Sequence, residues 1–292
     1  MIEIETIYNL FVNFFHSNNE NFSISLCRVG VGSVSFFIFC NFYFNKKYFS
    51  ANGYFPISYR SGLNFPPSFF DLSPKAPTFL LVIGLISSTL LTLGFLTPIT
   101  CFLTFLSYSS FMSRNNFCFH SGNSLLRLIL FLMIFSKSGQ ELSLDKYLNI
   151  ENLIPTFNFF EKLIKIQIAV MYIKTAWLKI NNFSWQDGSA LHYAINNKNY
   201  ARELNFNFLK KIFSNKLLLK ISSVSIVTVE FSIGLLCLTS DFAIFAFILG
   251  LLLHTLFLMF LRLKDFPHIC FACLLIFIPS ELIENYLNFL LR

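Results

Sequence analysis

Long apolar segments recur along this sequence and hold few charged residues. Charged residues make up 13% of the 292 residues, whereas a soluble domain carries roughly 25%. In lipid, backbone groups must bond within their own segment or within a closed barrel, and the alternating pattern of barrel strands is absent. The sequence therefore predicts an all-α, polytopic integral membrane helix bundle. We expect about eight transmembrane helices and no soluble domain, with spans at 23–44, 78–96, 98–112, 124–134, 159–180, 217–238, 242–263 and 269–283.

The segments that flank the predicted bundle differ from it in pattern. Residues 1–22 place Ile2, Ile7 and Phe11 on one side of a helix, which predicts an interfacial amphipathic segment. This segment holds Glu3 and no Lys or Arg, so it lacks the basic start of a cleavable signal. We expect the transmembrane domain to cover 23–285, with a long extramembrane loop at 45–76 and a C-terminal tail at 286–292. The span at 98–112 is shorter than the ~20 residues of an upright crossing, so it either tilts or stops part-way.

Charge and cysteine usage exclude several classes of protein. The net charge of +7 is scattered and forms no basic block, so we expect the lipid bilayer, and no nucleic acid, as the partner. Most of the cysteines lie in apolar runs. Cys270 and Cys273 form a CxxC motif, but no second CxxC and no His at metal spacing accompany it. We therefore interpret the cysteines as small apolar residues of membrane helices and expect no metal site.

A small set of ionisable residues lies inside the predicted spans. On a lipid-facing surface each would be costly, so these side chains are expected to face inward or to reach an interface. Six of them are of particular interest: Arg28, Arg127, Lys174, Lys179, Glu230 and His254. Arg28 lies near a helix start beside Gly30 and Gly32, which favours snorkelling and close helix packing over a functional role.

Lys179 is the candidate general base. It ends an apolar helix, and an aromatic and polar loop at 185–193 follows directly. Burial disfavours the charged form of an amine, as a general base requires; the alternative is a terminal lysine that reaches the lipid headgroups. Lys174 precedes it by five residues and points ~140° away around the helix, so the two amines do not share a face. Lys174 needs a partner of its own, for which Glu230 is a candidate.

Other polar residues have both structural and functional interpretations. Glu230 and His254 each lie in the middle of an apolar helix, which predicts a buried polar pair that either fixes packing or forms a site. His120 lies in the polar connector before the span at 124–134, as a loop residue or as a site residue. Arg127, one turn into that span, could meet a carboxylate or a ligand anion.

Several short motifs, in order along nearly the whole chain, resemble the HTTM domain family, the membrane region related to vitamin K-dependent gamma-carboxylase. The Arg-Val-Gly-Val-Gly sequence at 28–32, the polar connector at 113–116 and 121–128, and Ser-Leu-Asp at 143–145 are similar to that family. So are the helix at 167–179, the loop at 185–193 with its Trp-Gln-Asp-Gly start, and the closing helices with Glu230, His254 and the end at 277–279.

The resemblance implies a carboxylase-like lyase with an intramembrane pocket. Lys179 falls where the family's base, which deprotonates reduced vitamin K, is expected, so reduced vitamin K or another quinol is the implied cofactor. The family commonly has a histidine where Met112 stands, and His120 is the candidate substitute as a second catalytic residue. A water-poor pocket would shield a reactive base from quenching. The implied pocket residues are Gln167, Tyr172, Trp185, Asp187, Tyr193, Arg127, Glu230 and His254.

A second branch of the family is the alternative. Its sporulation-delaying-protein B-like members accompany the export and maturation of a secreted antimicrobial peptide, which implies a non-catalytic role with that peptide and its companion proteins as partners. Like them, this chain resembles the membrane region alone, and the large extramembrane domain of the carboxylase has no counterpart in it. We expect a multi-pass protein integral to the cell (plasma) membrane of a bacterium. A transporter would show internal pseudo-symmetry and broken helices, and the sequence shows neither.

Overall fold

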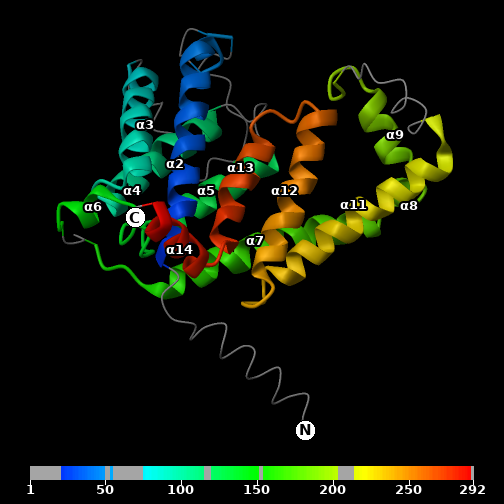
Figure 1. Cartoon of the computed structure of the whole chain (residues 1–292). Helices are drawn as coiled ribbons and strands as arrows, with labels where there is room; N and C mark the ends of the chain where they lie inside the picture. Colours follow the sequence, from blue (N-terminus) through cyan, green and yellow to red (C-terminus); the bar gives the residue numbers. More distant parts are fainter. Residues whose placement is uncertain are drawn as a thin grey trace. The chain divides into compact units, whose positions relative to one another are not determined.

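The computed structural model describes residues 21–49, 53–54, 75–114, 120–150, 154–202 and 214–290. Within these ranges the regular elements are helices, as predicted, and one isolated β-bridge joins Ala201 to Leu261 (Figure 1). The interfacial segment expected at 1–22 lies outside the described residues except for 21 and 22, and so does most of the loop expected at 45–76. The chain forms two compact units: an N-terminal unit of Asn19–Ile164 with Ser280–Arg292, and a C-terminal unit that includes Lys165–Pro279.

Four successive helices form the body of the N-terminal unit, and neighbours in the sequence pack on each other. They are α2 (Asn21–Phe44), α3 (Ala76–Leu93), α4 (Thr97–Arg114) and α5 (Ser121–Met133) (Figure 1). A proline in the first turn of α3 is tolerated because that N–H has no helical partner, and Gly94 ends the helix with a φ of 70°. Aromatic rings of α2 and α4 fill the core, with centroids 4.8 to 6.5 Å apart, from Phe39, Phe42, Tyr108 and Phe111.

The C-terminal unit is built around two long apolar helices, α11 (Lys216–Leu236) and α12 (Ala243–Phe260). These helices pack on each other, and α12 also packs on α13 (Phe266–Leu274), which passes into η4 (Leu275–Phe277). Two short helices, α8 (Phe183–Gln186) and α9 (Ser189–Asn196), pack against α11 (Figure 1). The long helix α7 (Asn158–Ile180) begins in the N-terminal unit and continues into this one.

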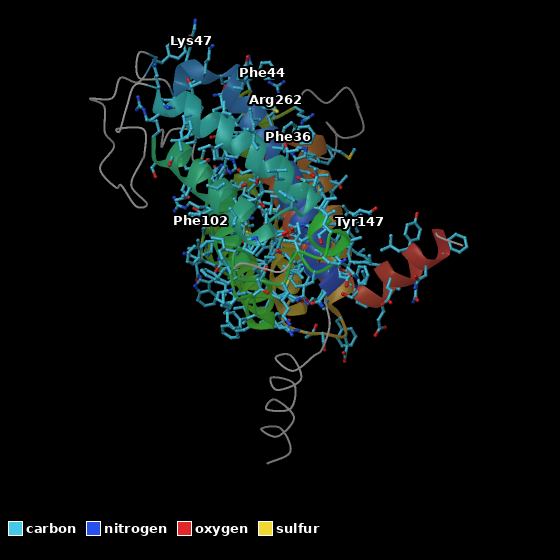
Figure 2. All side chains as sticks on the ribbon, turned by 90° about the vertical axis from the view of Figure 1, so that its left-hand side faces the viewer. Phe36, Phe44, Lys47, Phe102, Tyr147 and Arg262 are labelled. Carbon is cyan, nitrogen blue, oxygen red and sulfur yellow. The ribbon has the colours of Figure 1, made fainter. Side chains whose placement is uncertain are left out.

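Four of the described helices, α2, α3, α11 and α12, are long and apolar enough to cross a membrane. A fifth is counted if Phe266–Phe277 and Ser280–Phe289 make one broken span. Only 33% of the apolar stretch of α3 and of α11, and 28% of that of α12, is buried. Many of their apolar side chains are therefore only half-covered or exposed, which is unfavourable in water and favourable in lipid. Phe44 and Phe102 of the N-terminal unit are exposed in the same way (Figure 2).

Three expected spans are helices that length and composition do not mark as crossings. Helix α5 has 13 residues, short of the ~20 of a span. Helix α4 is rich in Ser and Thr, and α7 carries Lys174 and Lys179 within its apolar part. The continuous helix expected at 269–283 is interrupted at Ile278 and Pro279, because proline cannot donate the helical hydrogen bond. Helix α14 (Ser280–Leu290) then begins and runs into residues expected as a tail.

Candidate functional site

One face of α7 carries the two polar residues on which the candidate site is built. Tyr172 and Lys179 are seven residues apart, so they lie on the same face, two turns from each other. Ile168 and Ala176 are buried on this side of the helix, whereas Lys174 is exposed. The difference between the two lysines agrees with the angular offset expected from their spacing.

Lys179 forms a largely buried ion pair with Glu230 of α11. The distance from Nζ of Lys179 to Oε1 of Glu230 is 2.5 Å, and the two side chains are 20% and 7% exposed. The ring of Trp185 covers the ammonium, with its centroid 4.6 Å from Nζ, as in a cation–π contact. The other carboxylate oxygen, Oε2, is buried and finds no hydrogen-bond partner among the described residues. The sequence made Glu230 a candidate partner of Lys174. In the structure Glu230 bonds Lys179 instead.

Two contacts with α11 hold the loop that carries Trp185. The hydroxyl of Ser223 donates a hydrogen bond to the Trp185 carbonyl oxygen at 2.7 Å. Gly188 has a φ of +86° and lies so close to α11 that an added Cβ would be 2.7 Å from the backbone nitrogen of Lys220. Because both contacts end on the helix that bears Glu230, the Trp185 ring is fixed relative to that carboxylate.

A pocket of about 290 Å³ lies beside the ion pair. Lys179, Trp185 and Gln186 form its polar side. The rest of its wall consists of Ile180, Val224, Val227, Thr228 and Phe231. A mostly apolar wall with a few convergent polar groups is the usual construction of a small-molecule site.

A second buried contact joins the same face of α7 to α12. The hydroxyl of Tyr172 and Nε2 of His254 are 2.7 Å apart, and both side chains are buried. The imidazole is surrounded at centroid distances of 5.6 to 6.0 Å by the rings of Phe257, Phe266 and Phe271. Its Nδ1 has no hydrogen-bond partner within the described ranges. The expected pair of Glu230 with His254 does not form, because α7 offers each of them its own partner.

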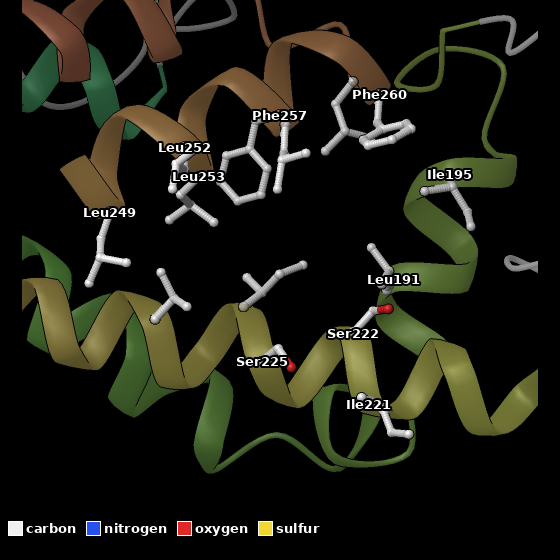
Figure 3. Close-up of a pocket in the computed structure, with 14 residues that line it drawn as sticks. Leu191, Ile195, Ile221, Ser222, Ser225, Leu249, Leu252, Leu253, Phe257 and Phe260 are labelled. Atoms are coloured by element: carbon white, nitrogen blue, oxygen red, sulfur yellow. The ribbon is translucent and has the colours of Figure 1, made fainter. Parts of the chain in front are cut away.

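A larger apolar pocket, of about 400 Å³, lies on another face of α11, toward α12 and α9 (Figure 3). Ser222 and Ser225 supply the polar atoms of its side-chain wall, and the other lining residues are apolar. None of the residues predicted from the sequence lines it. The two pockets share no lining residue, so this one is separate from the pocket beside Lys179.

Of the predicted pocket residues, Trp185 lines the pocket beside Lys179. Glu230 bonds Lys179 without lining the pocket, and Tyr172 and His254 form their own contact. Three further predicted residues of the C-terminal unit do neither. Gln167 is half-buried on α7, and Tyr193 is 71% exposed on α9. Asp187 is exposed and accepts a hydrogen bond from the Ser189 backbone N–H at 2.8 Å. That bond holds the pKa of Asp187 below its usual value. The role of Asp187 in this structure is to stabilise the start of α9.

His120 and Arg127 belong to the N-terminal unit, so the site around Lys179 contains neither. The backbone N–H of His120 donates to Oδ1 of Asn123 at 2.7 Å, which stabilises the start of α5. Asn123 in turn donates to the hydroxyl of Tyr108 at 2.6 Å. Arg127 is half-buried on α5.

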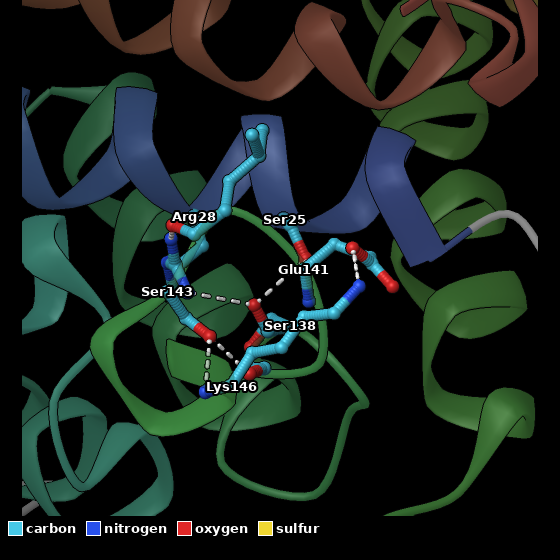
Figure 4. A network of polar contacts seen from close by, with 8 residues as sticks. Ser25, Arg28, Ser138, Glu141, Ser143 and Lys146 are labelled. Atoms are coloured by element: carbon cyan, nitrogen blue, oxygen red, sulfur yellow. Dashed lines mark hydrogen bonds and ion pairs between the residues drawn. The ribbon is translucent and has the colours of Figure 1, made fainter. Parts of the chain in front are cut away.

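Arg28 forms a separate polar centre in the N-terminal unit. Its side chain is fully buried. The guanidinium donates from Nη1 to the Ser138 carbonyl oxygen at 3.0 Å and from Nη2 to the Leu142 carbonyl oxygen (Figure 4). Arg28 was expected to reach the membrane surface by snorkelling, and this expectation is wrong, because backbone carbonyls inside the unit satisfy the charge. The residue instead ties α2 to the loop after α5, which is a packing role.

Asp145 of the short helix α6 (Leu144–Tyr147) completes this centre. Its carboxylate accepts hydrogen bonds from the backbone N–H groups of Leu96 and Thr97 at 2.6 and 2.9 Å, at the start of α4. It is buried and lies within electrostatic range of Arg28. Two motifs noted separately in the sequence, at 28–32 and 143–145, thus meet in one structural element.

Sequence reasoning did not single out the residues of α11 that surround Glu230. Ser223, Val227 and Glu230 are spaced by four and three residues, which places them on one helix face. All three are buried. This spacing is the signal that could have shown which side of α11 faces the site.

The described residues do not form a recognisable metal site. Among them no group of three or more His, Cys, Asp or Glu could hold a metal ion. Cys270 and Cys273 are buried on α13. The polar groups that line the pocket beside Lys179 include its amine and the Gln186 amide, whereas the Glu230 carboxylate lies buried behind the amine.

Together these helices and the buried ion pair define a helical membrane protein with a polar site in its C-terminal unit. The chain belongs to the HTTM domain family, whose match covers residues 68–281, and the resemblance seen in the sequence motifs is confirmed. The matched range includes Lys179, Trp185, Glu230 and His254. No curated protein and no solved structure matches the chain.

Proposed function

We propose that this chain is a multi-pass protein of a bacterial cell membrane that takes a proton from a quinol-type cofactor bound beside Lys179, in the manner of a carboxylase-like lyase. The observation that carries the proposal is the largely buried Lys179–Glu230 pair under the Trp185 ring, whose lysine lies in the wall of a pocket of about 290 Å³. We expect α4, α5, α7 and the α13–η4 segment to lie in the bilayer beside the four apolar spans, as the eight-helix arrangement requires.

The residues at this pocket fit a reduced quinone in their chemistry. The apolar wall, with the rings of Trp185 and Phe231, suits an aromatic ring with an apolar substituent. Lys179 and Gln186 line the pocket, so the amine and the amide are the groups that could hydrogen-bond to a ligand hydroxyl. When bound, a hydroquinone supplies a weakly acidic hydroxyl and the electrons for reaction with oxygen.

The ion pair determines where the proton goes. The amine of Lys179 donates a hydrogen bond to Oε1 of Glu230 at 2.5 Å, so it is engaged with the carboxylate and is not an isolated base. The carboxylate can take a proton from the Lys179 nitrogen at Oε1, which leaves the amine, in the pocket wall, to accept the proton of the ligand. The step leaves the pair with one additional proton and the ligand with one fewer. We therefore assign the base role to the pair and not to Lys179 alone.

The test compares the purified wild type with three variants in lipid nanodiscs supplied with reduced vitamin K and oxygen. Lys179→Arg keeps the positive charge and the pairing with Glu230 but cannot release a proton near neutral pH. Lys179→Ala removes both, and Glu230→Gln removes the carboxylate. We expect turnover to fall by about 100-fold or more in all three, with binding of the quinol retained in Lys179→Arg. Equal turnover in wild type and Lys179→Arg would contradict a base role.

A non-catalytic role in the export or maturation of a secreted peptide is the alternative. A buried ion pair fixes helix packing as readily as it performs catalysis, which favours this role if the wild type shows no turnover of reduced vitamin K. Deletion of the gene should then leave the secreted peptide immature. A fully matured peptide in the deletion strain would rule this alternative out.

A further inference from the structure

Helix α14 has two faces of opposite character. The polar residues follow one another on one side, and they are Glu281, Glu284, Asn285 and Asn288. On the other side Leu282, Tyr286 and Phe289 recur at spacings of four and three, which is one helix face. These three side chains are 54%, 63% and 74% exposed, so within the described structure nothing covers the outer part of the apolar side.

The first residue of α14 is attached to the first turn of a candidate membrane span. The Ser280 hydroxyl accepts a hydrogen bond from the Ser23 backbone N–H at 3.2 Å, and the two hydroxyl oxygens are 2.9 Å apart. Ser23 lies in the opening turn of α2, which begins at Asn21 and is apolar enough to cross the bilayer. Because a span begins near the membrane surface, α14 starts at that level. It then runs sideways from the bundle of its own unit (Figure 2).

Helix α6 lies at the same end of α2. The Glu141 backbone N–H, in the loop before α6, donates to the Ser25 hydroxyl at 3.3 Å, and the Lys146 ammonium lies 5.9 Å from the ring centroid of Phe22. Tyr147 is 81% exposed at the end of α6 (Figure 2). Two short helices, joined to one turn of α2 by different contacts, therefore both present large apolar side chains outward.

Helix α14 is unsuited to crossing the bilayer by itself. Its 11 residues extend only about 16 Å at 1.5 Å per residue, against a hydrocarbon core of about 30 Å. It also carries Glu281 and Glu284, which are costly at depth. Tyrosine and phenylalanine beside carboxylates and amides are instead suited to the boundary, where one side of a helix is wet and the other meets lipid.

We propose that α14 lies in the plane of the membrane and that its face of Leu282, Tyr286 and Phe289 inserts into the headgroup region of the bilayer. Tyr147 of α6 reaches the same boundary. The two helices form an interfacial anchor at the end of the N-terminal unit where α2 begins. On this basis the pair Phe266–Phe277 and Ser280–Phe289 is not one broken span.

The test places a tryptophan on either side of α14 in the full chain. Tyr286→Trp puts the indole on the apolar face, and Asn288→Trp puts it on the polar face. Each variant is reconstituted in phosphatidylcholine vesicles brominated either near the glycerol or near the chain end. The emission added above that of the wild type is measured. We expect glycerol-proximal bromine to quench the added emission of Tyr286→Trp several-fold more than chain-end bromine, and neither to quench that of Asn288→Trp appreciably.

Three outcomes would overturn the proposal. Stronger quenching by chain-end bromine would place α14 across the bilayer. Equal quenching of the two variants would mean that the helix has no lipid-facing side. The absence of quenching in Tyr286→Trp would mean that protein, such as a second copy of the chain, covers this face. Phe289→Trp tests the same face if Tyr286→Trp does not fold, and the result does not depend on any activity of the site beside Lys179.

Discussion

The Lys179–Glu230 pair should show a large coupling free energy in a double-mutant cycle. Loss of one partner from a fully buried ion pair costs about 3–5 kcal/mol. Here the Lys179 side chain keeps 20% exposure and its contact with Trp185. We therefore expect each single substitution to lower the free energy of unfolding by about 2–3 kcal/mol. Lys179→Met and Glu230→Met are the single variants, because methionine fills a similar volume without charge. The double variant should lose less unfolding free energy than either single variant, which gives a coupling free energy of about 2 kcal/mol or more.

Reversible unfolding in mixed micelles, titrated with a denaturing detergent and followed by far-ultraviolet circular dichroism, measures these free energies. The exposed pair of Lys146 with Glu141 is the matched control, since its side chains are 57% and 18% exposed. A cycle at that pair should give a coupling of about 1 kcal/mol or less. A coupling below about 0.5 kcal/mol at Lys179 and Glu230, within the additivity error of independent sites, would refute the buried pair.

The remaining predictions concern backbone space and the buried arginine. Gly188→Ala should destabilise the protein by about 1–3 kcal/mol in the same unfolding assay, because an L-residue is strained at its φ of +86° and the new Cβ meets the Lys220 backbone. Gly250→Ala, whose added methyl meets only the end of a flexible side chain, should cost less, and the reverse order would contradict the described loop. Arg28→Lys should lower the unfolding free energy by about 2 kcal/mol or more, because one ammonium cannot replace the fork that binds two carbonyls. An unfolding midpoint equal to that of the wild type would show that the carbonyl contacts are unimportant.

The helices could be predicted from the sequence, because the length of an apolar run reflects the thickness of the bilayer. The break before α14 was missed, although Pro279 marks it, since the apolar residues continue on both sides of the proline. The role of Arg28 was also missed. Its partners are carbonyl oxygens of a loop more than a hundred residues away, and backbone acceptors leave no trace in side-chain sequence.

The candidate site could be predicted only in part. The angular offset of Lys174 from Lys179 follows from helix geometry, so their different exposure was within reach of the sequence. The pairing of Lys179 with Glu230 was not, because 51 residues separate them and the contact depends on how α7 and α11 cross. His254 was noted correctly as a buried polar residue, but its partner Tyr172 was decided by the same helix crossing.

The seven-residue interval between Tyr172 and Lys179 makes the length of that stretch of α7 as important as the two side chains. Insertion or deletion of a single residue between them would turn one by about 100° relative to the other. The amine and the phenol could then no longer reach α11 and α12 at the same time. Family members that use both contacts should therefore tolerate substitutions within this interval but not a change in its number of residues.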